Sequence, residues 1–134
     1  MAQPSANYFS TLTDLVQPFL DKVNVQRLDL NPTRALWEVQ GNKGHFDIRL
    51  KEIFSSTGRM YSYYVLVQGQ VLVGFDNYPD KRALQQKYGQ DYQQHSSELV
   101  PHRHGHLKVS LELTKEMTVE DFLAYVKETL IREE

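Results

Sequence analysis

The chain has 134 residues, of which 40% are hydrophobic and 24% are charged, and its formal net charge is −2 at pH 7. This size and composition can fill one ordinary hydrophobic core, so we expect a single domain over residues 1–134. The small negative charge excludes a global basic field, and any contact with nucleic acid would have to come from a local patch. Cysteine is absent, which excludes disulfides, thiolate metal sites and a cysteine nucleophile.

The sequence shows no targeting or membrane signal. Residues 1–5 have neither a basic start nor a continuous apolar run, so we expect neither a signal peptide nor an anchor. No apolar segment reaches the length that crosses a bilayer, and we expect no membrane partner. The cytoplasm is the default location.

Apolar residues at spacings of three and four predict an amphipathic helix near the N-terminus. They are Phe9, Leu12, Leu15, Val16, Phe19 and Leu20. Pro18 interrupts this pattern, because an interior proline removes a hydrogen bond and clashes with the preceding turn. We expect it either to kink the helix or to start a second short one.

Alternating apolar and polar residues, broken by turn residues, predict four or five antiparallel strands between residues 23 and 77. Residues 35–39 and 46–50 form one predicted hairpin, and residues 61–67 and 71–75 form another. A polar surface insertion is expected at about residues 80–99.

The insertion contains a possible short helix at residues 82–88, which ends at Gly89. A half-buried strand is then predicted at residues 107–113, where the leucines and Val109 share one face. Thr118 is the predicted N-cap of a last helix, with Glu120 and Asp121 in the first turn. Its apolar stripe comprises Val119, Phe122, Leu123, Val126 and Leu130.

This order of elements predicts an α+β fold. We expect an antiparallel sheet of five to six strands packed against N- and C-terminal helices. The opposite face of the sheet should be polar.

Three of the five histidines, His102, His104 and His106, alternate directly before the last predicted strand. In an extended chain their side chains would share one face. Imidazole titrates near neutral pH, so such a row is suited to proton transfer, anion binding or metal binding. Asp76, followed by Asn77, ends an earlier predicted strand and could orient one of these rings.

Several interpretations of these residues stay open at the level of sequence. A zinc-like ion could take the histidines together with Asp76, although Gly105 is expected to separate His106 from the other two. Acid–base or phosphate-binding use of His102 and His104 is favoured over a metal site, and it requires no metal or other cofactor. A solvated turn with a purely structural role is the remaining alternative.

Other residues suggest contact with RNA. Arg49 and Lys51 alternate with apolar residues, which places them on the solvent face of a strand where they could meet phosphate. Tyrosines such as Tyr61, Tyr63 and Tyr64 could stack on bases. Alternation sends Tyr63 and Tyr64 to opposite faces, so at least one tyrosine is expected in the core.

Read in order, these segments resemble the TumE family, the toxin half of prokaryotic toxin–antitoxin pairs. The matching segments are residues 61–64, 74–79 and 101–104, and the resemblance covers about residues 34–130. Members of the family carry an aspartate-asparagine-x-proline-histidine element and a later proline-histidine-histidine-lysine-histidine element. This chain differs in having Asp80 where the family usually has histidine, and Gly74-Phe75 where an arginine commonly precedes the aspartate.

The resemblance implies a small toxin that a cognate helix-turn-helix antitoxin binds and neutralises. We infer a ribonuclease-like activity, in which His102 and His104 act as base and acid and Arg49 or Arg103 binds the phosphate. Asp76 and Asn77 are their expected neighbours. Two alternatives are a non-enzymatic protein-binding module and a metal-dependent hydrolase.

Overall fold

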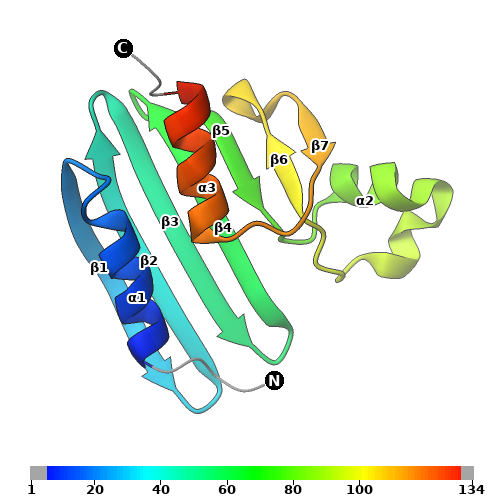
Figure 1. The fold of residues 1–134 in the computed structure, drawn as a ribbon. Coiled ribbons are helices and arrows are strands. Elements are labelled where there is room, and N and C mark those ends of the chain that lie inside the picture. Colours follow the sequence, from blue (N-terminus) through cyan, green and yellow to red (C-terminus); the bar gives the residue numbers. More distant parts are fainter. Residues whose placement is uncertain (1–5, 131–134) are drawn as a thin grey trace.

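The fold is α+β, as predicted, but its antiparallel sheet has seven strands rather than five to six (Figure 1). The computed structural model describes residues 6–130, and the expectation for residues 1–5 lies outside this part. The strands follow one another across the sheet in sequence order from β1 to β7. They are β1 (Lys22–Asn31), β2 (Arg34–Lys43), β3 (Phe46–Ser55), β4 (Gly58–Val67), β5 (Gln70–Asp76), β6 (His102–His104) and β7 (Leu111–Leu113).

The helices are α1 (Ala6–Val16), α2 (Lys81–Tyr88) and α3 (Val119–Tyr125), with shorter helical turns η1 (Gly89–His95), η2 (His106–Lys108) and η3 (Val126–Leu130). Figure 1 shows α1 and α3 on the same face of the sheet, while α2 lies beyond the β7 edge. Within residues 6–130, no helix is long and apolar enough to cross a membrane.

Helix α1 buries Phe9, Leu12 and Val16 on one face, as their spacing predicts. It ends at Val16, and Pro18 lies in the turn that follows. Proline has no N–H to continue the helix, and the helix ends before Pro18. The predicted kink or second short helix at Pro18 is therefore wrong. The chain instead turns directly into β1.

Strands β2 to β5 contain the two predicted hairpins. At the β4–β5 turn, Gln68 and Gly69 have φ angles of 53° and 80°, the left-handed conformation that tight hairpin turns require. Alternation directs Tyr63 into the core and Tyr64 to the opposite face. This agrees with the prediction that the two tyrosines point in opposite directions.

The hydrophobic core lies between the sheet and helices α1 and α3. Its largest fully buried side chains include Trp37, Tyr61, Tyr63, Phe9 and Phe122. The stripe of α3 and η3 packs on this core, with Val119, Phe122 and Val126 buried. Thr118 caps α3 in a reciprocal capping box with Asp121, which confirms the predicted helix start.

A buried ion pair lies within this apolar layer. The Glu52 side chain is fully buried, and its Oε2 lies 3.2 Å from a guanidinium nitrogen of Arg59. Tyr8 and Tyr63 donate hydrogen bonds of 2.6 and 2.5 Å to the Glu52 carboxylate. Each charge is therefore compensated, as a buried charge must be.

The predicted strand at residues 107–113 is wrong over its first half. Leu107 and Lys108 have φ angles of 56° and 60° and belong to the turn η2. This turn reverses the chain between β6 and β7, so the segment forms a short hairpin, and Val109 is 76% exposed. The additional reversal explains why the sheet has more strands than expected.

The polar insertion folds as α2 and η1. Asp80 caps α2 by accepting a hydrogen bond from the Ala83 N–H, and Gly89 follows the last helical residue, as predicted. Ala83 and Leu84 pack with Val100 and Leu111 in a second, smaller apolar cluster. The insertion is thereby attached to the β7 edge of the sheet.

Candidate functional site

Strands β5 and β6 bring Asp76, His102 and His104 together. The antiparallel register places Asp76 opposite His102 and Gly74 opposite His104. Since side chains alternate along a strand, both histidines point to the same face. This is the face opposite α1 and α3, and we call it the open face.

The three side chains converge on one point. The Nε2 atoms of His102 and His104 lie 3.2 Å apart. Asp76 Oδ1 lies 3.2 Å from His102 Nε2, and Asp76 Oδ2 lies 3.5 Å from His104 Nε2. We call these three residues the Asp–His–His cluster.

The cluster is buried and held by neighbouring groups. His102, His104 and Asp76 are 0%, 4% and 7% exposed. His102 Nδ1–H donates a 2.6 Å hydrogen bond to the Val100 carbonyl, which leaves Nε2 directed at the cluster.

Asp76 is oriented by two further donors. The Tyr64 hydroxyl donates to Oδ2 at 2.7 Å, and the Tyr78 N–H donates to Oδ1 at 3.0 Å. His104 Nδ1 is buried and has no hydrogen-bond partner among the described residues. The Tyr64 ring stacks near the His104 ring, with 6.3 Å between ring centroids.

These contacts shift the pKa values of the cluster in different directions. Burial alone would raise the pKa of Asp76, but the hydrogen bond and charge of His102 lower it overall. Burial alone would lower the pKa of His102, and Asp76 reverses this and raises it. Burial, with positive charge on His102 and Lys108, lowers the pKa of His104 despite the attraction of Asp76. The cluster thus favours an Asp76–His102 ion pair beside a neutral His104.

The cluster opens onto a cleft of about 380 Å³ on the open face. The cleft is lined by Lys51, Ser62, Tyr64, Asp76, Tyr78, Pro79, Asp80, Arg82, His104 and Lys108. His104 and Asp76 reach its wall, whereas His102 lies behind them. Three cations, from Lys51, Arg82 and Lys108, surround the opening.

A second hollow of about 250 Å³ continues from the cleft across β3 and β4. The two share Lys51, Ser62, Tyr64 and Lys108 as walls. Arg49 lines this second hollow and is paired with Asp47 at 3.1 Å. Arg49 is therefore near the cleft but outside the Asp–His–His cluster.

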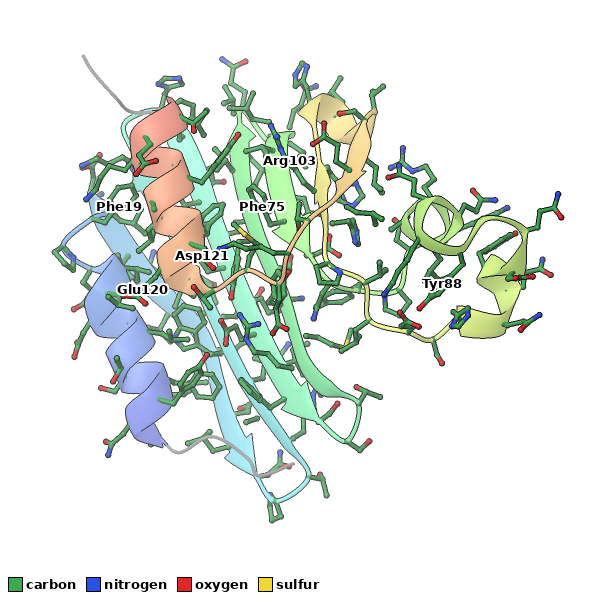
Figure 2. The ribbon with its side chains drawn as sticks, turned by 45° about the vertical axis from the view of Figure 1, so that its right-hand side comes forward. Phe19, Phe75, Tyr88, Arg103, Glu120 and Asp121 are labelled. Atoms are coloured by element: carbon green, nitrogen blue, oxygen red, sulfur yellow. The ribbon has the colours of Figure 1, made fainter. Side chains whose placement is uncertain are left out.

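Two other predicted site residues lie elsewhere. Arg103 points to the helix-bearing face, where its guanidinium lies 5.5 Å from the centroid of the Tyr125 ring, and Figure 2 shows it beside α3. Strand alternation between His102 and His104 causes this placement, so Arg103 cannot share a phosphate with them.

Asn77 is buried and bound to the backbone. Its Oδ1 accepts from the Tyr61 N–H at 2.9 Å, and its Nδ2 donates to the Arg59 carbonyl at 2.8 Å. Both side-chain groups are therefore used in joining the end of β5 to β4. His106, the third alternating histidine, is exposed in η2 and does not join the cluster.

Sequence reasoning missed Tyr64, Lys51, Arg82 and Lys108 as members of one site. The strand register supplies the signal for the first two. Tyr64 pairs with Gly74, which lies opposite His104, and Lys51 pairs with Ser62, which lies opposite Asp76. Arg82 is held near the cleft because it donates to the carbonyls of Val109 and Lys108, both at 3.1 Å. These contacts come from α2 and η2, whose positions no local pattern specifies.

Comparisons with protein-family models, with curated proteins and with solved structures found no match to this chain.

Proposed function

We propose that this chain binds RNA in the cleft of the open face and cleaves a phosphodiester bond there, as the toxin of a toxin–antitoxin pair. The convergence of Asp76, His102 and His104 beside a cation-lined cleft is the observation that carries this proposal. Buried titratable groups with opposite pKa shifts are typical of catalytic sites.

The cleft offers the chemistry that RNA requires. Lys51, Arg82 and Lys108 provide positive charge for phosphate groups despite the net charge of −2. The Tyr64 ring lines the same cleft, with Lys108 Nζ 5.0 Å from its centroid. An aromatic ring beside a cation supports stacking of a base together with contact to its phosphate.

We infer different tasks for the two histidines. An acid and a base on opposite sides of a phosphorus atom each need a hydrogen bond of about 2.7 Å to a different oxygen. The two Nε2 atoms are only 3.2 Å apart, so they act at one point. His104 lines the cleft, where its neutral ring takes the proton of the ribose 2′-hydroxyl as that oxygen attacks the phosphorus and then returns the proton to the departing 5′-oxygen. His102 and Asp76 position the His104 ring for these transfers.

The resemblance to the TumE family supports the toxin assignment and the helix-turn-helix antitoxin as partner. The two positions at which this chain departs from the family pattern lie in different parts of the structure. Phe75 packs on the helix-bearing face against Phe122 and Tyr125, so an arginine at this position would start from the face opposite the cluster. Asp80 lines the cleft itself, where a histidine would add a further titratable group.

RNA cleavage by purified protein tests the proposal. Wild-type protein should degrade cellular RNA, while the His102→Ala, His104→Ala double variant should not. His106→Gln is the matched control, because His106 lies in the same segment but outside the cluster, and it should retain activity. An inactive wild type, or equal cleavage by wild type and double variant, would contradict the proposed reaction.

Exposed apolar residues on β1 favour a second candidate, a protein-binding module without catalysis. Val25, Leu28 and Leu30 are 48%, 50% and 45% exposed on this edge strand, and apolar side chains on a free sheet edge suit pairing with a partner. Co-purification with the product of the adjacent gene, without RNA cleavage, would support this alternative. A monomer that cleaves RNA and binds no partner would count against it.

A further inference from the structure

We propose that Asp76, His102 and His104 form a binding site for a divalent first-row transition metal ion, with zinc as the best match. This inference deepens the proposed function. A role for the ion in RNA cleavage rests on the proposed function. Binding of the ion itself does not depend on RNA and is tested separately.

The distances within the cluster match those between ligands of one ion. Zinc binds imidazole nitrogen at about 2.0–2.1 Å in tetrahedral geometry, which places two such nitrogens about 3.3 Å apart. The two Nε2 atoms lie 3.2 Å apart, which matches this value. Asp76 faces both of them, with Oδ1 3.2 Å from His102 Nε2 and Oδ2 3.5 Å from His104 Nε2. Three donor atoms, one from each residue, lie within 4.8 Å of one another.

The outer contacts are those that orient metal ligands. A ligating histidine usually donates its other ring N–H to a carbonyl or carboxylate, and His102 does so to the Val100 carbonyl at 2.6 Å. Ligating carboxylates are likewise held by hydrogen bonds. The Tyr64 hydroxyl and the Tyr78 N–H hold the two oxygens of Asp76.

The cluster leaves a position open toward substrate. Three protein ligands with a free fourth position are typical of catalytic zinc, whereas structural zinc has four protein ligands. His104 and Asp76 reach the wall of the cleft, so the free position would face the bound phosphate. The ion would supply a Lewis acid at the one point where both imidazoles act.

A shared proton is the competing explanation of the same distances. A protonated His102 could donate from Nε2 to both Asp76 and His104 without any ion. Once the ion displaces the His102 proton, two imidazole nitrogens and one carboxylate nevertheless fit zinc and its neighbours better than magnesium, which prefers oxygen ligands. Titration with metal alone distinguishes the two explanations.

The test uses full-length protein stripped with a chelator and then freed of it. Zinc chloride is titrated by calorimetry, and cobalt(II) by visible absorption, which reports a four-coordinate ion directly. Wild type should bind one equivalent of either ion. Asp76→Asn and His104→Gln should each weaken binding by about 100-fold or more, and the matched control His106→Gln should bind like wild type.

Circular dichroism shows whether each variant is folded. If a variant is unfolded, the cobalt spectrum of wild type alone tests whether the protein holds a four-coordinate ion. Wild type that shows no uptake of either ion, or equal uptake by His104→Gln and wild type, would overturn the metal site. Cleavage of RNA in chelator without metal uptake would refute the metal site and leave the proposed function intact. Metal uptake without RNA cleavage would refute the proposed function and leave the metal site intact.

Discussion

Gly74 lies directly beneath the Tyr64 ring, and this contact sets the position of the hydroxyl that binds Asp76. Gly74 is opposite Tyr64 on β4 and opposite His104 on β6. A Cβ atom added at Gly74 would overlap Cε2 and Cδ2 of Tyr64 and would lie 2.5 Å from Cζ. The optimal separation of two carbon atoms is about 3.5–4.0 Å, so Gly74→Ala must displace the ring.

We expect Gly74→Ala to lower the free energy of unfolding by about 1.5–5.5 kcal/mol. Overpacking costs about 1–3 kcal/mol, and loss of the 2.7 Å hydrogen bond from Tyr64 to the Asp76 carboxylate adds about 1.5–3 kcal/mol. The reduced entropy of the unfolded chain offsets about 0.4–1 kcal/mol of this loss. Urea unfolding of wild type and variant measures the difference.

A double-mutant cycle isolates the role of the ring. In a Tyr64→Ala background the clash is absent, so Gly74→Ala should change stability by less than about 1 kcal/mol in either direction. An equal loss in both backgrounds would refute the argument, because the cost would then come from the backbone rather than from Tyr64.

Three further predictions concern the buried charges and the cleft. Glu52→Gln should destabilise the protein by about 1.5–3 kcal/mol in urea unfolding, because it removes the buried carboxylate that binds Arg59 and leaves the exposed Glu116 as the remaining carboxylate partner, and a loss below about 1 kcal/mol would contradict this. With metal chelated, the stabilising effect of Asp76 on His102 should be largest between about pH 4 and 6.5. It is lost as pH falls through the lowered pKa of Asp76, and also as pH rises through the raised pKa of His102. Asp76→Asn should therefore cost most in this window, and a cost independent of pH in urea unfolding would argue against the ion pair. Lys51→Ala should weaken RNA binding and reduce the slope of log affinity against log salt by about 1, as fluorescence anisotropy can measure; an unchanged slope would place Lys51 away from phosphate.

Most of the fold could be predicted from the sequence, because most of its helices and strands have strong local patterns of apolar residues. Apolar spacing defined α1 and α3, and alternation defined the hairpins of β2 to β5. The errors arose where tertiary contacts override the local pattern. Leu107 and Val109 alternate like strand residues, but Leu107 lies in the turn η2 and Val109 follows it. Both side chains are exposed because the chain reverses direction here between β6 and β7.

The buried Glu52–Arg59 pair shows another limit of the sequence. Alternation with Ile48 and Leu50 gives Glu52 an inward position, but a charged residue there reads as an interruption of the apolar face. Its partner Arg59 lies across the β3–β4 turn, and Tyr8 comes from α1. Only the folded chain brings these polar groups together.

The candidate site was partly predictable for a similar reason. The spacing of His102 and His104 indicated a shared face, and Asp76 was expected nearby as the end of a neighbouring strand. The same spacing places Arg103 on the other face, so its predicted contact with phosphate conflicts with strand geometry. Of the cleft cations, Lys51 was expected on the solvent face of its strand, but Arg82 and Lys108 could not be predicted because they reach the cleft through the packing of α2 and η2.

The rate of cleavage of a single-stranded RNA by wild type and by His104→Gln, at equal folded fractions, tests the central claim most directly. The account predicts that wild type cleaves the RNA, leaves DNA of the same sequence intact because attack requires the 2′-hydroxyl, and loses at least about 100-fold in rate with His104→Gln. Equal rates for the two proteins, or no cleavage by wild type, would contradict it.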